Sequence, residues 1–152
     1  MKRISVFGAT GSIGQNTLDL IQRDPDTYDV VALSGGHNID QLAKDAVAFG
    51  AKIAVTAYED RYQDLKSALS GTGIDVACGS QAIVDAAQRP VDIAVSAIVG
   101  AAGLGSGVAT LEQGATLALA NKESMVCAGR LMQSKVKSFG GRILPVDSEH
   151  SA

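Results

Sequence analysis

The sequence has no tryptophan, only two cysteines and three prolines, and no excess of basic residues. With 13 Lys and Arg against 16 Asp and Glu, and with neither a basic cluster nor an aromatic platform, it lacks the pattern of a nucleic-acid-binding protein. We therefore expect no nucleic-acid partner. Cys78 and Cys127 lie too far apart for a metal-binding or redox pair, which predicts buried, reduced thiols in a cytoplasmic protein.

Long apolar runs are also missing. None reaches the ~18 residues that a membrane-spanning helix needs, and the first residues lead straight into a strand pattern, without the charged and then apolar leader of a signal peptide. These absences predict a cytoplasmic protein with no membrane partner. A length of 152 residues fits one domain with a real core, and no repeat, low-complexity tract or linker divides it.

Strand-like and helix-like segments alternate along the whole sequence. Short β-branched or continuously apolar runs predict strands at Arg3–Gly8, Tyr28–Ser34, Ile53–Thr56, Ile74–Cys78, Val91–Ala97, Thr116–Ala120 and Arg142–Val146. Segments with apolar residues at helical spacing predict helices at Ser12–Arg23, Ile39–Phe49, Asp60–Leu69, Ser80–Gln88, Ala101–Gln113 and Lys122–Phe139. In the first helix, Ile13, Thr17, Leu20 and Ile21 are expected on the inner face. The alternation predicts an α/β, Rossmann-like fold, a doubly wound, mainly parallel sheet with helices on both faces.

Three glycines in the pattern GxxGxxG lie between the first predicted strand and the first helix, in GATGSIG at Gly8–Gly14. Glycines at such a turn let the backbone approach a pyrophosphate closely, and the helix N-terminus offers free N–H groups to the phosphates. Thr10 and Ser12 add hydroxyl donors. A purely structural turn is the alternative, but the position between a strand and a helix favours dinucleotide binding.

The segment after the second predicted strand, Ser34–Asn38 with the sequence SGGHN, contains no acid. NAD-specific folds place a carboxylate there to bind the ribose 2′-hydroxyl, and that carboxylate would repel a 2′-phosphate. Small residues, exposed backbone N–H groups and a potentially cationic His37 accommodate the phosphate instead. The segment therefore predicts NADPH rather than NADH, although His37 alone also fits a solvated loop histidine. Asp40 comes just beyond, in the first turn of the next predicted helix.

Two further polar segments follow predicted strands at the other end of the sequence. Asn121, Lys122 and Glu123 come directly after Thr116–Ala120, so they face the same edge of the sheet as the glycine turn. A plain helix start is the alternative, with Asn121 as N-cap and Glu123 in the first turn, and it still leaves Lys122 free for a substrate.

Asp147 and Glu149 follow the last predicted strand. In an extended segment, residues two apart point the same way, so these two carboxylates converge. Oxygen ligands suit Mg²⁺ or Mn²⁺ and disfavour zinc, and they do not distinguish the two ions. The spacing by itself favours solvated loop charges, but the position at a strand end, beside the expected nicotinamide site, favours a metal site.

Two other reductase signatures do not fit. Tyr62 and Lys66 match the YxxxK dyad of short-chain dehydrogenases, but they lie on a peripheral predicted helix, where i,i+4 spacing is an ordinary surface pair. A semialdehyde dehydrogenase needs a catalytic cysteine at a helix N-terminus, and neither Cys78 nor Cys127 stands in a suitable motif.

Four segments together resemble the 1-deoxy-D-xylulose 5-phosphate reductoisomerase family: GATGSIGQNTLDL from Gly8, AIVGAAGL from Ala97, LANKES from Leu119 and PVDSEHSA from Pro145. The resemblance implies an enzyme of non-mevalonate isoprenoid biosynthesis that depends on NADPH and on Mg²⁺ or Mn²⁺. Its substrate, 1-deoxy-D-xylulose 5-phosphate, is rearranged to a branched aldehyde and reduced to 2-C-methyl-D-erythritol 4-phosphate. The metal acts as Lewis acid and template, and the cofactor supplies the hydride.

The resemblance also implies roles for individual residues. The expected pyrophosphate and ribose contacts are Thr10, Gly11, Ser12 and Ile13, and the expected 2′-phosphate pocket is Gly36, His37 and Asn38. Further cofactor contacts are expected from Asn121 and Glu123, substrate contacts from Lys122, Ser148 and Glu149, and metal ligands from Asp147 and Glu149. Lys122 and Glu149 are thus the expected catalytic residues. Because His37 replaces a lysine of many relatives, the NADPH affinity is expected to vary with pH.

Family members run to roughly 400 residues in two or three domains. The resemblance therefore implies that residues 1–152 are the NADPH-binding domain and the first part of the metal and substrate site, without the catalytic and C-terminal domains. Such a piece is expected to be inactive alone, and the full-length enzyme is expected to be a homodimer. The alternative is a non-catalytic NADP-binding or sensing module, which a gene continuing past Ala152 with more acidic ligands would exclude.

Overall fold

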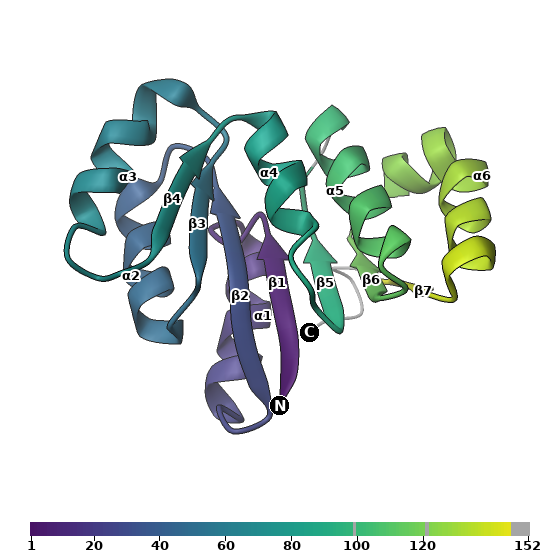
Figure 1. The fold of residues 1–152 in the computed structure, drawn as a ribbon, viewed down its shortest axis with the longest axis horizontal. Helices are drawn as coiled ribbons and strands as arrows, with labels where there is room; N and C mark the ends of the chain where they lie inside the picture. The colour runs from purple at the N-terminus through teal and green to yellow at the C-terminus, as the bar shows by residue number, and fades with distance from the viewer. Residues whose placement is uncertain (99, 121, 147–152) are drawn as a thin grey trace.

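The computed structural model describes residues 1–98, 100–120 and 122–146, with the backbone alone for residues 100–102 and 122–128. Within these residues the chain forms one parallel seven-stranded sheet in the order β4-β3-β2-β1-β5-β6-β7 (Figure 1). The strands are β1 (Lys2–Phe7), β2 (Tyr28–Gly35), β3 (Ile53–Thr56), β4 (Asp75–Cys78), β5 (Ile93–Ser96), β6 (Thr116–Leu119) and β7 (Arg142–Pro145). The helices are α1 (Ser12–Arg23), α2 (Ile39–Phe49), the 3₁₀-helix η1 (Glu59–Arg61), α3 (Tyr62–Ala68), α4 (Ser80–Ala87), α5 (Gly100–Glu112) and α6 (Lys122–Phe139).

Helices cover both faces of the sheet. Apolar side chains of α1, α2 and α3 share one core cluster with Val6 and Val30 of the central strands. On the other face, α4 and α5 pack around Phe7, and Met132 of α6 packs on Leu117. Right-handed crossovers place the helices in this way, because the first crossovers step along the sheet in one direction and the later ones in the other. The predicted doubly wound, Rossmann-like fold is confirmed.

The strand order reverses at β1, which pairs with β2 on one side and with β5 on the other. In the register, Ile4 lies opposite both Val30 and Ile93. Open parallel sheets bind ligands outside the carboxyl ends of their strands, at such a reversal. The fold therefore places the segment after β1 at the expected ligand position.

The two central strands are buried along their carboxyl halves, at Ile4–Phe7 and at residues 30–35. A parallel strand covered by helices on both faces has no solvent side, which explains why Val30–Leu33 is continuously apolar. Among the described residues, no helix has both the length and the apolar character needed to cross a membrane.

The helix predicted at Asp60–Leu69 is shorter than expected and begins differently. The structure has the 3₁₀ turn of η1 first, with α3 following at Tyr62. The Arg61 N–H donates to the carbonyl oxygen of Tyr58 at 3.1 Å, three residues back, which tightens this first turn. Apolar spacing cannot distinguish the two kinds of turn over so few residues.

The inner face of α1 also differs from the prediction. Leu20 was expected inside with Ile13, Thr17 and Ile21, but Leu20 is 63% exposed. The buried stripe contains Gly14, Leu18 and Ile21, which are spaced by four and three residues. Because Gly14 brings α1 very close to the turn before it, the helix is rotated so that Leu18 faces the sheet.

Candidate functional site

Residues 8–14 form the tight turn from β1 into α1, at the point where the strand order reverses. Gly8 has φ +86°, a left-handed conformation that favours glycine. At Gly14, a Cβ atom would clash with the Gly8 carbonyl oxygen and with the backbone of Ala9. These two glycines are therefore required by the turn and by the close packing of α1 on it.

Gly11 differs, because the fold does not need a glycine there. Its backbone is extended, with φ −80° and ψ 178°, and the nearest atom to an added Cβ would be the Gly8 carbonyl oxygen, at an ordinary 3.6 Å. Gly11 is the N-cap of α1, and no side chain of the described residues caps it. Uncapped N–H groups at a helix start, beside a residue without a side chain, suit an anionic ligand.

Ser34 at the end of β2 holds the turn in place. Its Oγ accepts a hydrogen bond from the Gly8 N–H at 2.9 Å, and its carbonyl oxygen accepts one from the Ala9 N–H at 2.7 Å. The side chain is buried, with 1% exposure. The sequence predicts Ser34 as the end of a strand and the start of an acid-free segment, but it does not predict this role.

A buried carboxylate on α2 supports the turn from the other side. Gln15 Nε2 donates to the Ala9 carbonyl oxygen at 2.9 Å and to Asp45 Oδ2 at 2.8 Å. Gln41 Nε2 donates to Asp45 Oδ1 at 3.0 Å, so both carboxylate oxygens of Asp45 are hydrogen-bonded. Asp45 is only 7% exposed. This network joins α1, α2 and the turn, and no sequence motif signalled it.

A hollow of about 420 Å³ lies outside the carboxyl ends of β1, β2 and β3. It is lined by Gly8, Thr10, Ser34, Gly35, Gly36, Ala57, Tyr58, Ser80, Ile83 and Ile98. A Cβ atom at Gly35 would lie 3.2 Å from Thr10 Cγ2, and one at Gly36 would lie 3.2 Å from Tyr58 Cε2. The two glycines thus let these side chains close around the hollow. Its mixture of apolar walls and a few hydroxyl groups suits a nucleoside.

A second, more polar hollow of about 360 Å³ lies beside the start of α2. It is lined by His37, Asn38, Ile39, Asp40, Arg61, Asp64 and Ser67. The His37 ring stacks on Tyr58, which also lines the first hollow, with centroids 3.8 Å apart and planes 8° from parallel. Asn38 caps α2, because its Oδ1 accepts a hydrogen bond from the Gln41 N–H at 3.3 Å. Gly36 thus lines the first hollow together with Thr10, whereas His37 and Asn38 line the second, and the stacked Tyr58 ring connects the two.

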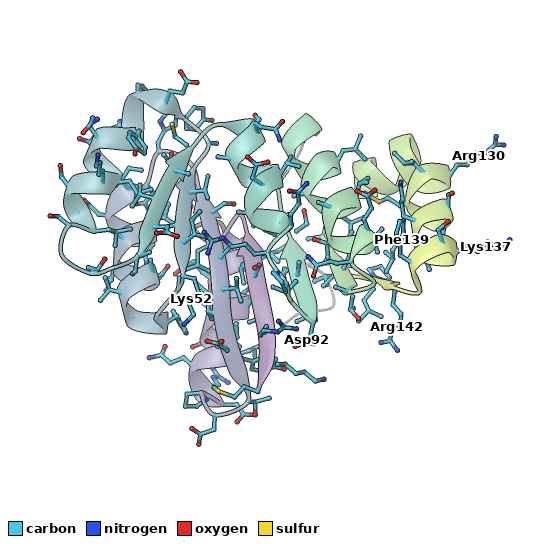
Figure 2. All side chains as sticks on the ribbon, viewed as in Figure 1. Lys52, Asp92, Arg130, Lys137, Phe139 and Arg142 are labelled. Atoms are coloured by element: carbon cyan, nitrogen blue, oxygen red, sulfur yellow. The ribbon has the colours of Figure 1, made fainter. Side chains whose placement is uncertain are left out.

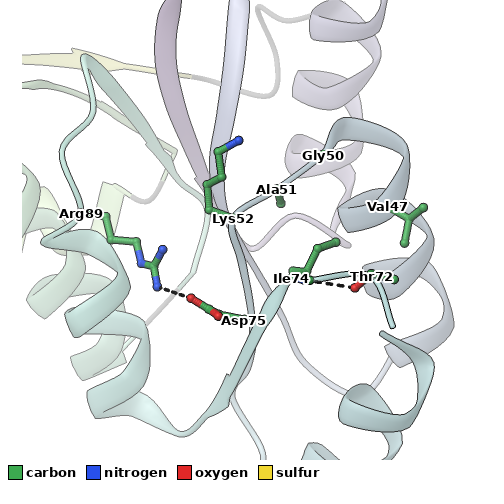
Figure 3. Close-up of a pocket in the computed structure, with 9 residues that line it drawn as sticks. Val47, Gly50, Ala51, Lys52, Thr72, Ile74, Asp75 and Arg89 are labelled. Atoms are coloured by element: carbon green, nitrogen blue, oxygen red, sulfur yellow. Dashed lines mark hydrogen bonds and ion pairs between the residues drawn. The ribbon is translucent and has the colours of Figure 1, made fainter. Parts of the chain in front are cut away.

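A hollow of about 480 Å³ at the opposite, amino-terminal ends of the strands is not the candidate site (Figure 3). It lies at the amino ends of β3 and β4, whereas parallel sheets bind ligands at the carboxyl ends. Its cations are already paired: Arg89 with Asp75 at 3.0 Å, and Lys52 with Asp29 at 3.9 Å. Both cations of this hollow are therefore in ion pairs within the protein.

Tyr62 and Lys66 form a surface pair on α3, as the sequence predicted. The Lys66 Nζ lies 5.8 Å from the centroid of the Tyr62 ring, within the range of a cation–π contact. The helix packs beside β4, at the end of the strand order farthest from β6 and β7.

Comparison with known proteins decides the family. The model of the 1-deoxy-D-xylulose 5-phosphate reductoisomerase family matches residues 4–129. The chain belongs to this family. It is 64% identical over 152 residues to the reductoisomerase of Ruegeria sp. (strain TM1040), covering 100% of this chain and 38% of that protein. It is 59% identical over 151 residues to the reductoisomerase of Jannaschia sp. (strain CCS1), covering 99% and 38%.

Solved reductoisomerase structures superpose closely on this chain. The enzyme from Zymomonas mobilis in complex with NADPH has a TM-score of 0.94 at 48% identity, covering 98% of this chain and 39% of that one. A reductoisomerase in complex with NADPH, fosmidomycin and magnesium has a TM-score of 0.90 at 38% identity, covering 99% and 37%. A biliverdin reductase from Synechocystis shares only the fold, with a TM-score of 0.62 at 17% identity.

The remaining residues expected from the reductoisomerase resemblance lie outside the described side chains. Asn121, Asp147, Ser148 and Glu149 are not described, and Lys122 and Glu123 are described only by their backbone at the start of α6. The preceding strands pair with each other, Leu119 opposite Pro145, and end at the same edge as the glycine turn. In the described part of the chain, no group of three or more His, Cys, Asp or Glu could hold a metal ion. The chain spans 38% of the length of its Ruegeria relative.

Proposed function

We propose that residues 1–152 are the NADPH-binding domain of a 1-deoxy-D-xylulose 5-phosphate reductoisomerase. The observation that carries this proposal is Gly11, a glycine that the fold does not need, at an uncapped helix start where the strand order reverses. Solved structures of related reductoisomerases in complex with NADPH also support NADPH as the ligand.

The residues present fit such a cofactor. In this proposal Thr10, Gly11, Ser12 and Ile13 contact the pyrophosphate and its ribose, where the N–H groups of α1 begin. The 2′-phosphate binds near Gly36, His37 and Asn38, at the start of α2, and the nucleoside occupies the hollow between Thr10 and Tyr58. Asn121 and Glu123 hold the cofactor further along the edge. Bound NADPH supplies the hydride for the reduction.

The whole protein is proposed to convert 1-deoxy-D-xylulose 5-phosphate to 2-C-methyl-D-erythritol 4-phosphate. Asp147 and Glu149 provide carboxylate oxygens for Mg²⁺ or Mn²⁺, which supplies Lewis-acid chemistry when bound. Lys122 and Ser148 contact the substrate, and Glu149 lies at both substrate and metal. The full-length enzyme is proposed to be a cytoplasmic homodimer without nucleic-acid or membrane partners.

A fluorescence titration of NADPH, and separately of NADH, tests the cofactor assignment; the chain has no tryptophan to obscure the nicotinamide signal. We expect NADPH to bind at least tenfold more tightly, about 1.4 kcal/mol. Equal affinities, in this chain and again in the full-length protein, would contradict the assignment of the 2′-phosphate pocket.

Gly11→Val provides the sharper variant. Because a side chain there meets only ordinary contacts in an extended backbone, the loss of stability should be limited to about 1 kcal/mol, the cost of replacing glycine by valine at an N-cap. The branched side chain obstructs the approach of a pyrophosphate, so NADPH affinity should fall by tenfold or more. Unchanged NADPH affinity in a folded Gly11→Val chain would contradict the proposed contact between Gly11 and the pyrophosphate.

A further inference from the structure

Arg61 lines the polar hollow, although it is more than 20 residues along the chain from His37 and Asn38. It ends η1, between β3 and α3. Its N–H donates to the carbonyl oxygen of Tyr58, and the Tyr58 ring stacks on His37. The segment that holds Arg61 is thereby fixed against the segment that holds His37.

The hydrogen bonds of the Arg61 guanidinium are incomplete. Its Nη1 lies 3.3 Å from Asp64 Oδ2, an i,i+3 ion pair on the surface. Its Nε is buried and has no hydrogen-bond partner among the described residues. Buried donors are normally satisfied, so the guanidinium keeps hydrogen-bonding capacity that the described residues do not use. The side chain as a whole is 44% exposed, so a ligand can reach the guanidinium through its exposed atoms, although the Nε itself is buried.

The chemistry of the ligand follows from the guanidinium rather than from the net charge of the hollow, because two carboxylates, Asp40 and Asp64, also line it. Arg61 is permanently cationic, and Asp64 already pairs with it. The other charged or titratable neighbours are His37 and Asp40, from the start of α2. A guanidinium binds the oxygens of a phosphate in a fork, and it keeps this ability while one of its nitrogens stays paired with a carboxylate.

We infer that Arg61 is a specificity-determining contact for the 2′-phosphate of NADPH. The inference rests on the proposed cofactor function and adds a cationic side chain to Gly36, His37 and Asn38. Arg61 comes from the segment after β3, opposite the start of α2, so the phosphate lies between two segments. No motif marks it, because its approach depends on the pairing of β3 with β2.

Arg61→Gln tests the inference, with Arg89→Gln as matched control. Both arginines are paired with an aspartate, but Arg89 lines the hollow at the amino ends of β3 and β4 and not the polar hollow (Figure 3). The dissociation constants of NADPH and NADH are measured by fluorescence titration for each variant, with the thermal midpoint as a check on folding. Arg61→Gln should weaken NADPH about tenfold and leave NADH within twofold, because NADH has no 2′-phosphate. Arg61→Lys, which keeps the charge and loses the fork, should weaken NADPH about threefold.

The outcomes separate this inference from the proposed function. Stronger binding of NADPH than NADH by the unmodified chain, with unchanged NADPH affinity in folded Arg61→Gln and Arg61→Lys chains, would overturn the role of Arg61 alone. Equal weakening of NADPH and NADH would also overturn it, because the effect would then not depend on the 2′-phosphate. If the chain binds neither NADPH nor NADH, both the role of Arg61 and the proposed NADPH-binding function are overturned. A loss of NADPH affinity in Arg89→Gln as large as in Arg61→Gln would likewise count against the assignment.

Discussion

Asp92 joins β5 to β1 at the amino-terminal edge of the sheet (Figure 2). The backbone N–H of Arg3 donates to its Oδ2 at 2.8 Å, and Arg3 Nε lies 3.7 Å from the same oxygen. The hydrogen bond from the Arg3 N–H is the largest cause that holds the pKa of the Asp92 carboxyl below its ordinary value of 3.8, outweighing desolvation, which raises the pKa.

This shift predicts a pH dependence of stability. A carboxyl whose pKa is lower in the folded state stabilises the fold above its unfolded pKa and loses this contribution as the pH falls through the folded pKa. Asp92→Asn should therefore lower the free energy of unfolding at about pH 7, and the deficit should shrink at about pH 3. Urea unfolding at both pH values measures this. A deficit of the same size at both would contradict the linkage.

Single residues also show where sequence reasoning stops. The spacing of Gly8, Gly11 and Gly14 predicts the turn, but not which glycine the fold needs, because that depends on where other backbone atoms lie. Asp45 lies on the helix face with Leu42 and Ala46, where a charged residue contradicts the apolar pattern. It is buried because Gln15 of another helix reaches it, a contact that local sequence does not encode.

At the scale of elements, the packing of α1 on the turn depends on Gly14. Gly14→Ala forces the helix away from the Gly8 carbonyl, which should cost roughly 3 kcal/mol and lower the thermal midpoint by roughly 10 °C. Gly129→Ala in α6 is the matched control, because a Cβ there meets nothing within 4 Å and alanine favours a helix by up to about 1 kcal/mol. Thermal unfolding measures both, and a Gly14→Ala chain as stable as the control would contradict this packing.

The elements themselves were largely predictable, since α1, α2, β3 and α6 have the predicted bounds. Gly or Pro follows the three helices closely, at Pro25, Gly50 and Gly140, and β3 is a short, mostly apolar and β-branched run, which explains this success. The exception is the segment before α3, where a 3₁₀ turn replaces the first helical turn. That turn contains Arg61, which lines the polar hollow. The start of this helix is thus predicted wrongly at the same place where the sequence gives no sign of a candidate binding residue.

At the scale of the whole molecule, the chain is expected to bind NADPH without turning over. It spans 38% of the length of its Ruegeria relative, and the proposed conversion is that of the whole protein. With 1-deoxy-D-xylulose 5-phosphate and Mg²⁺, the absorbance of NADPH should stay constant for this chain and fall for the full-length enzyme. Oxidation of NADPH by the chain alone would contradict this division of labour.

Alternation along the sequence predicted a parallel sheet with helices on both faces, but it contained no information on the order of the strands. That order depends on which strands pair with β1, and these pairings join segments that are far apart in the sequence. The substrate and metal half of the candidate site stays a prediction, because its residues lie outside the described side chains.

The central position of β1 has a consequence for how the chain folds. By residue 78 the strands on one side of β1 have all been synthesised, namely its partner β2 and then β3 and β4, whereas β5, its partner on the other side, begins only at Ile93. During synthesis from the N-terminus, the side of β1 that later pairs with β5 therefore has no partner strand when β2, β3 and β4 have already been made. An open, buried-type strand edge is a template for mispairing. The docking of β5 on β1 is thus the step that covers this open side of the strand.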